Sequence, residues 1–245
     1  MSHDDDRPVG RLLTRREVLA SFGVAAVWAA VPGSHLVRAT RGRVPRCVVR
    51  PAQTEGPYFV DTRLDRADIR SDPASGLVSE GEPLELVFQV GRMDGGECRP
   101  LPGVLVDIWQ CDAGGVYSGV KDISNRFDTT GKQFLRGHQR TDANGQATFR
   151  TIYPGWYQGR AVHIHFKLRT NPAGRGEEFT SQLYFDDKVS DELFTHAPYA
   201  ANAQSRVRNS ADGIFRRERG DELVMEVARN GKGFRGGFDI GMVMS

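Results

Sequence analysis

The sequence carries little net charge and has no apolar run long enough to span a membrane. Its 245 residues carry a formal net charge of only +2. Beyond the N-terminal segment, acidic and basic residues are interspersed without a basic block, so a nucleic-acid partner is not expected. The apolar run over residues 18–31 is shorter than the roughly 20 residues that cross a bilayer. We therefore expect no stable membrane span.

This apolar run belongs to a segment with the features of a bacterial export signal. It follows the twin-arginine pair Arg15-Arg16, and small residues lead on to Ala39. We expect residues 1–40 to be a twin-arginine export signal and linker, with the cleavage site left open, and the mature protein to be periplasmic or secreted. The twin-arginine route exports folded proteins, often with a cofactor in place, which favours a metal or redox centre.

Cysteine is also scarce. The chain has three, Cys47, Cys98 and Cys111, and no Cys-x-x-Cys spacing that would indicate a thiolate zinc site. In an exported protein, one disulfide and one free thiol are expected. The sequence does not choose which two cysteines pair.

Helical periodicity is weak, and its best example covers residues 191–203. Glycine (28) and proline (12) are plentiful, as in turn-rich β proteins. Short strand-like segments are bounded by turn residues such as Asn144-Gly145. We expect strands over residues 84–90, 104–110, 146–153, 162–168, 181–185, 223–227 and 238–243. Residues 41–245 are therefore predicted to form one all-β domain, an antiparallel β-sandwich with long loops and little helix.

Two histidines within one predicted strand are the strongest indication of a functional site. His163 and His165 are two residues apart, so their side chains lie on one face of the strand. The apolar Val162, Ile164 and Phe166 point to the other face, toward a core. A histidine pair on one face, close to a turn with tyrosine and arginine, indicates a metal site.

The oxygen donors near this pair are tyrosines. No Asp or Glu lies close in sequence to the histidines, whereas Tyr157 is six residues before His163 and Tyr117 follows the strand over residues 104–110. A phenolate forms at neutral pH only if a cation stabilises it, since the ordinary tyrosine pKa is about 10. Because hard phenolate oxygens suit a trivalent ion, two tyrosines and two histidines favour ferric iron over zinc.

Several motifs in order resemble the intradiol ring-cleavage dioxygenases, ferric enzymes that cleave catechols between the two hydroxylated carbons. The resemblance covers roughly residues 47–185. The motifs are Thr54-Glu55-Gly56-Pro57-Tyr58, Asp107-Ile108-Trp109-Gln110 through Gly115-Val116-Tyr117, Arg150-Thr151-Ile152-Tyr153-Pro154-Gly155, Arg160-Ala161-Val162-His163-Ile164-His165-Phe166 and Gln182-Leu183-Tyr184-Phe185.

The resemblance implies a role for each matching residue. Tyr117 and His163 would be the in-plane ligands of a non-haem ferric ion, and Tyr157 and His165 the axial ligands. Arg160 would stabilise negative charge on the substrate, and Tyr157 would also act in catalysis. Substrate-binding roles follow for Gln182, in the pocket, and Tyr58, at its mouth.

The resemblance also implies a function. We expect a dioxygenase that uses dioxygen to convert a catechol-type aromatic into a cis,cis-muconate-type diacid. The helical N-terminal region of the catechol-type members is absent, which places the chain with the small exported branch; a homodimer is one assembly it allows. Two alternatives stay open: an exported β-sandwich binding module without catalysis, and a zinc or copper protein that uses His163 and His165. The sequence does not select one catechol.

Overall fold

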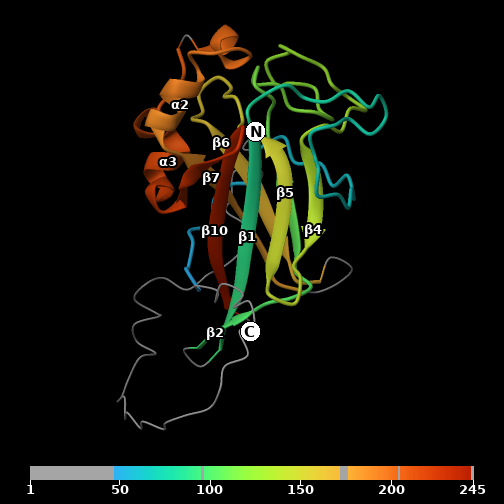
Figure 1. Cartoon of the computed structure of the whole chain (residues 1–245), viewed down its shortest axis with the longest axis vertical. Helices are drawn as coiled ribbons and strands as arrows, with labels where there is room; N and C mark the ends of the chain where they lie inside the picture. Colours follow the sequence, from blue (N-terminus) through green and yellow to red (C-terminus); the bar gives the residue numbers. More distant parts are fainter. Residues whose placement is uncertain (1–46, 95–96, 172–175, 204, 244–245) are drawn as a thin grey trace, which may run out of the picture.

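The computed structural model describes residues 47–94, 97–171, 176–203 and 205–243, so the predicted signal at residues 1–40 lies outside the described residues. Two sheets of five strands each form the described part. Figure 1 shows β1, β5 and β10 in front of β6 and β7. The strands are β1 (Pro83–Asp94), β2 (Glu97–Pro100), β3 (Leu105–Trp109), β4 (Arg136–Arg140), β5 (Gln146–Ile152), β6 (His163–Arg169), β7 (Glu178–Phe185), β8 (Val224–Met225), β9 (Val227–Asn230) and β10 (Gly233–Val243).

The all-β sandwich is confirmed, but its sheets are mixed. One sheet has the order β2-β1-β10-β9 with β5 also paired to β1, and the other has the order β4-β3-β6-β7-β8. Most neighbours are antiparallel, whereas β1 pairs with β10 and β7 with β8 in parallel. Parallel neighbours need a long connection. Both pairs have one: the helical region connects β7 to β8, and the strands β2 to β9 lie between β1 and β10 in the sequence.

The helical region differs from its prediction. The helix α2 (Asp187–Leu193) begins before the expected range 191–203, because Asp186 caps it by accepting a hydrogen bond from the Lys188 N–H. A second short helix, α3 (Gly213–Arg217), is capped in the same way by Asp212. Figure 1 shows both helices near one end of the sandwich. No helix in the described ranges is long and apolar enough to cross a membrane.

Aromatic side chains from both sheets fill the core. The ring of Phe88 on β1 lies 5.3 Å from that of Phe166 on β6, and Phe166 lies 5.5 Å from Phe238 on β10. As predicted, Val162, Ile164 and Phe166 point into this core. The alternate residues of β6 therefore point away from the other sheet, toward the loops that cover it.

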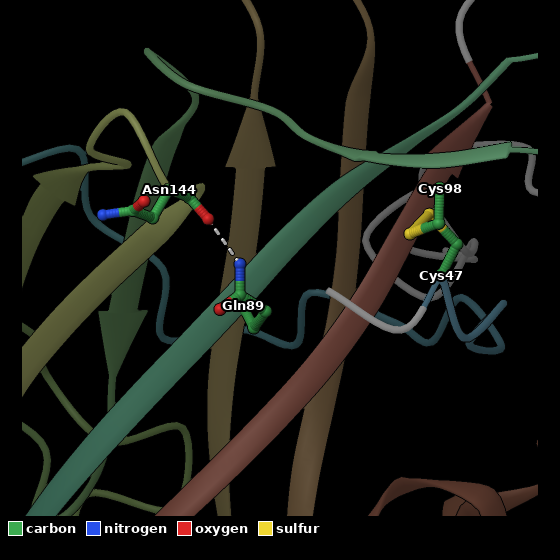
Figure 2. The surroundings of a disulfide bond; sticks show 4 residues. All are labelled: Cys47, Gln89, Cys98 and Asn144. Atoms are coloured by element: carbon green, nitrogen blue, oxygen red, sulfur yellow. Dashed lines mark hydrogen bonds between the residues drawn. A yellow bond between two sulfur atoms is a disulfide. The ribbon is translucent and has the colours of Figure 1, made fainter. Parts of the chain in front are cut away.

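A disulfide joins Cys47 to Cys98 on β2, and Cys111 is a buried free thiol. The expectation of one disulfide and one free thiol is confirmed, and the structure supplies the pairing. Figure 2 shows this disulfide together with a nearby hydrogen bond, in which Gln89 Nε2 on β1 donates to the carbonyl of Asn144. The disulfide fixes the first described residue to the end of β1 that pairs with β2.

Candidate metal centre

The two histidines lie side by side where β6 begins. Their Nε2 atoms are 3.0 Å apart. The Nδ1 atom of His163 lies 2.7 Å from the carbonyl oxygen of Ala161, which can only accept a hydrogen bond. Nδ1 therefore carries the proton, and Nε2 presents a lone pair to its surroundings. A hydrogen bond of this kind, made by the ring nitrogen that faces away from the metal, orients histidines that bind metals.

Tyr117 reaches the same point from the loop after β3. Its hydroxyl is 3.4 Å from Nε2 of His163, and its side chain is fully buried. The loop turns at Gly115, which has a φ of +87°, and a Cβ there would lie 2.3 Å from the Trp156 carbonyl oxygen. Only glycine fits this close approach, so the Gly-Gly pair before Tyr117 shapes the path that brings the phenol to the histidines.

Tyr157 approaches from the loop between β5 and β6. Its ring lies 5.5 Å from that of Tyr117 and 5.6 Å from that of His163. The hydroxyl accepts a hydrogen bond of 3.3 Å from the Arg160 guanidinium. Tyr157 alone of the four predicted ligands is partly exposed. The structure thus brings all four predicted ligands together, and one of them opens to the outside.

The surroundings keep these four side chains neutral. Burial raises the pKa of Tyr117 well above its ordinary value, and burial also raises the pKa of Tyr157, although the Arg160 cation opposes it. Burial and the Arg160 charge lower the pKa of His163, and burial with the neighbouring imidazole lowers the pKa of His165. The imidazoles are therefore free to act as ligands, whereas each phenol must lose its proton to a cation.

The spacing of three of the donor atoms fits a single ion. Two ligands each about 2.1 Å from one metal, at angles between a right angle and the tetrahedral angle, lie about 3.0 to 3.4 Å apart. The measured separations between His163 and its neighbours His165 and Tyr117 are 3.0 and 3.4 Å. The Nδ1 atom of His165 is buried without a hydrogen-bond partner among the described residues. In the same part of the chain no three His, Cys, Asp or Glu side chains gather into a metal site. Two phenol oxygens with two imidazole nitrogens are a donor set that suits a hard ferric ion.

All three guanidinium nitrogens of Arg160 make hydrogen bonds to other side chains. Its Nε donates to Asp212 at 3.0 Å, and its second terminal nitrogen donates to Gln182 at 2.5 Å and to the Tyr184 hydroxyl at 3.2 Å. Burial alone lowers the pKa of Arg160, but nearby Tyr157, Tyr184 and Asp212 raise it above its ordinary value. Arg160 is a fixed cation beside the four donors, and not a surface ion-pair residue.

The two predicted substrate-binding residues lie close to the centre, but their polar side-chain atoms are hydrogen-bonded to other protein groups. Gln182 is fully buried, donates to the Thr54 carbonyl at 3.0 Å and accepts from Arg160. Tyr58 packs its ring 4.8 Å from that of Tyr117, while its hydroxyl donates to Asp122 at 2.6 Å. Both residues support the walls of the site in this structure.

A cavity of about 470 Å³ opens beside Tyr157. Apolar side chains line much of it, and Arg126 and Asn202 add polar groups at its wall. Clefts of this size hold drug-sized ligands and not only single rings. Of the four predicted ligands, Tyr157 lines this cavity, so a small molecule in the cavity would contact Tyr157.

Three residues of the site were missed as functional residues in the sequence. Asp212 contacts Arg160 from 52 positions away, so no local spacing pointed to it. Tyr184 was part of a family motif, but its hydrogen bonds to Arg160 and Gln53 join segments that are distant in sequence. Trp109 was also part of a family motif; it is buried, and it stacks on His165.

Comparison with known proteins agrees with this geometry. A family model described as "Dioxygenase" matches residues 54–228. The chain is 35% identical to a catechol 1,2-dioxygenase from Acinetobacter baylyi over an alignment of 202 residues that covers 67% of this chain and 58% of that protein. It is 32% identical to a protocatechuate 3,4-dioxygenase beta chain from Burkholderia cepacia over 60% of this chain and 66% of that one. The chain thus spans less than two thirds of the length of both curated relatives.

Solved structures support the same relationship. An intradiol ring-cleavage dioxygenase from Tetranychus urticae is 28% identical, with a TM-score of 0.66 over 81% of this chain and 95% of that one. The dioxygenase domain of a carbohydrate-binding fusion protein from Streptomyces sp. SirexAA-E is 33% identical, with a TM-score of 0.57 over 81% of this chain and all of that one. The chain belongs to the intradiol ring-cleavage dioxygenase family.

Proposed function

We propose that this protein is a non-haem ferric dioxygenase that cleaves catechol-type aromatics with dioxygen to cis,cis-muconate-type diacids. The observation that carries the proposal is the convergence of Tyr117, Tyr157, His163 and His165, of which Tyr157 also lines an open cavity. These four side chains would hold the iron. A bound ferric ion would orient both catechol oxygens and draw electron density from the ring, which opens a ring carbon to dioxygen.

The protein side chains supply proton transfer and charge. As a phenolate, the Tyr157 oxygen would take a proton from a catechol hydroxyl, since it borders both the donor set and the cavity. The Arg160 guanidinium, 3.3 Å from that oxygen, would stabilise negative charge as the catechol loses its protons. Both groups are mostly shielded from water, which strengthens this electrostatic stabilisation.

The cavity favours substituted catechols as substrates. Phe127, Trp156 and Val116 offer an apolar surface for a substituent, and Asn202 offers a polar contact. A catechol ring placed against Tyr157 would leave room for such a group in a cavity of about 470 Å³.

Oxygen uptake by the purified, iron-loaded protein tests the proposal. Catechol, hydroxyquinol, protocatechuate and larger 4-substituted catechols should be tried, with the products identified by mass. A ring-cleaved diacid is the expected product, and a semialdehyde would contradict intradiol cleavage. The iron-loaded protein should be red-brown from ferric–phenolate charge transfer. A colourless protein that holds zinc, or one that binds catechol without consuming oxygen, would support the alternatives instead.

We also propose that the protein is exported by the twin-arginine route. The disulfide between Cys47 and Cys98 supports this, because disulfides persist in oxidising compartments. Replacement of Arg15 and Arg16 by lysine should retain the protein in the cytoplasm of a bacterial host. Unchanged export of that variant would contradict the proposal.

A further inference from the structure

Asp212 is a carboxylate with no exposed surface at the back of the metal centre. Its Oδ2 accepts two hydrogen bonds, from Arg160 Nε at 3.0 Å and from the Ala161 backbone N–H at 2.8 Å. Its Oδ1 accepts the backbone N–H groups of Ile214 at 2.8 Å and Phe215 at 3.2 Å. Oδ1 therefore caps α3, and Oδ2 accepts its hydrogen bonds from the segment that leads into β6.

The three nitrogens of Arg160 are divided among different partners. Asp212 holds Nε, while Gln182 and Tyr184 hold one terminal nitrogen. The remaining terminal nitrogen faces the Tyr157 hydroxyl at 3.3 Å. A guanidinium is a rigid planar fork, so contacts that fix two of its nitrogens also fix the direction of the third.

Helix capping alone does not explain this carboxylate. Capping of α3 uses Oδ1, and a serine or asparagine would serve that purpose. A buried carboxylate is costly unless a cation and hydrogen-bond donors compensate it. Arg160 is the cation in direct contact with Asp212 among the described ion pairs.

We propose that Asp212 is a positioning residue for the reaction proposed above. It orients Arg160 so that one terminal nitrogen points to the Tyr157 oxygen. Through the Ala161 N–H, it also fixes the backbone two residues before His163. The proposal rests on the proposed function for its kinetic consequence, but the orientation of Arg160 is a property of the protein without iron.

The isosteric variant Asp212→Asn tests this role, with Asp186→Asn as the matched control. Asp186 also caps a short helix, by accepting the Lys188 N–H, and it has no contact with Arg160 or the four predicted ligands. We expect kcat to fall about 10- to 100-fold in Asp212→Asn with a smaller change in KM, because partners that orient a site contribute on this scale. Asp186→Asn should retain the wild-type values.

A double-mutant cycle separates positioning from general stability. If Asp212 acts through Arg160, then Asp212→Asn should cause little further loss of kcat in an Arg160→Ala background. Losses that simply add would overturn the proposal. Wild-type kcat in a folded Asp212→Asn variant would also overturn it.

A measurement on the iron-free protein makes the test independent of catalysis. The Nε–H proton of Arg160 should give an NMR signal protected from solvent exchange, and Asp212→Asn should abolish this protection. If that variant does not fold, Asp212→Ser keeps a capping oxygen while removing the group that reaches Arg160. Protection that survives either substitution would overturn the proposal, whether or not the wild type consumes oxygen with a catechol.

Discussion

The indole ring of Trp109 stacks on the imidazole of His165, with centroids 5.0 Å apart and planes inclined by 7°. The two residues are register partners between β3 and β6. Neither Trp109 Nε1 nor His165 Nδ1 has a hydrogen-bond partner within the described ranges. Stacking on Trp109 therefore orients His165, as the hydrogen bond to the Ala161 carbonyl orients His163.

Trp109→Leu should weaken iron binding. The leucine removes the flat surface that orients His165, so the imidazole gains rotational freedom and iron affinity should fall about 10-fold. Titration of the apoprotein with ferric iron, followed by its colour, measures this effect. Phe149→Leu is the control, since Phe149 is buried in the core and touches none of the ligands. Equal affinities of the two variants would contradict the role given to stacking.

Tyr157→Phe should shift the visible absorption of the iron-loaded protein and slow turnover. The substitution removes one of the two predicted phenolate donors while retaining the ring. Tyr58→Phe is the matched comparison, because the Tyr58 hydroxyl donates to Asp122 and is directed to that carboxylate. The absorption band of Tyr58→Phe should stay in place. A band that stays in place in Tyr157→Phe would remove Tyr157 from the ligand set.

The local parts of the site were predictable from the sequence. The alternation around His163 and His165 separates a ligand face from a core face, and the strand has both faces as expected. Asp212 was not predictable in this way, because its partner Arg160 lies in a distant segment and a buried ion pair leaves no periodic pattern. Residue type and strand alternation mark the histidines, whereas the contact between Asp212 and Arg160 depends on how distant segments pack.

For the fold, too, local strands were predictable and pairings between distant segments were not. Strands with alternating apolar residues, such as β1 and β5, begin within a residue or two of their predicted positions. The strand β4 was missed because its sequence, Arg-Gly-His-Gln-Arg, has no apolar alternation. Its place in the sheet depends on pairing with β3. The parallel pairing of β1 with β10 was missed because it is a contact between distant segments.

Gly115→Ala should disrupt the loop that carries Tyr117. The added Cβ would meet the Trp156 carbonyl oxygen at 2.3 Å, in addition to the strain of a positive φ. We expect a loss of about 2 kcal/mol or more in unfolding free energy, together with weaker iron binding. Gly131→Ala isolates the backbone contribution, because Gly131 has a φ of +83° and open space around it. Equal losses in both variants would show that the close approach is unimportant.

Asp72→Asn should reduce stability at neutral pH but not in strong acid. Burial raises the pKa of Asp72, but hydrogen bonds from the Gln133 and Ser75 N–H groups outweigh burial and hold it below its ordinary value. The carboxylate stabilises the fold above the unfolded pKa of about 3.9, and this contribution disappears as pH falls through the folded pKa. Denaturant unfolding should show a loss of about 1 to 3 kcal/mol at pH 7. A loss independent of pH would contradict this assignment.

Removal of the disulfide should lower the unfolding free energy. The bridge closes a loop with a sequence separation of 51, for which loss of chain entropy in the unfolded state predicts about 4 kcal/mol. The double variant Cys47→Ala/Cys98→Ala should show this loss in denaturant unfolding. Cys111→Ala keeps the bridge, so reducing agent should still destabilise that variant. Equal stability of wild type with and without reducing agent would contradict the prediction.

The parallel ladder between β1 and β10 has a consequence for the order in which the protein is made. Leu84 on β1 pairs with Phe234 on β10, so β1 completes its pairing only after β10 has been synthesised. While the ribosome is still synthesising the chain, one edge of β1 has no partner, and the sheet is completed only after β10 emerges. Contacts over such distances in sequence slow folding. The sheet that contains β1 is therefore completed late, and until β10 pairs with it, one edge of β1 offers unpaired backbone groups to other strands or to chaperones.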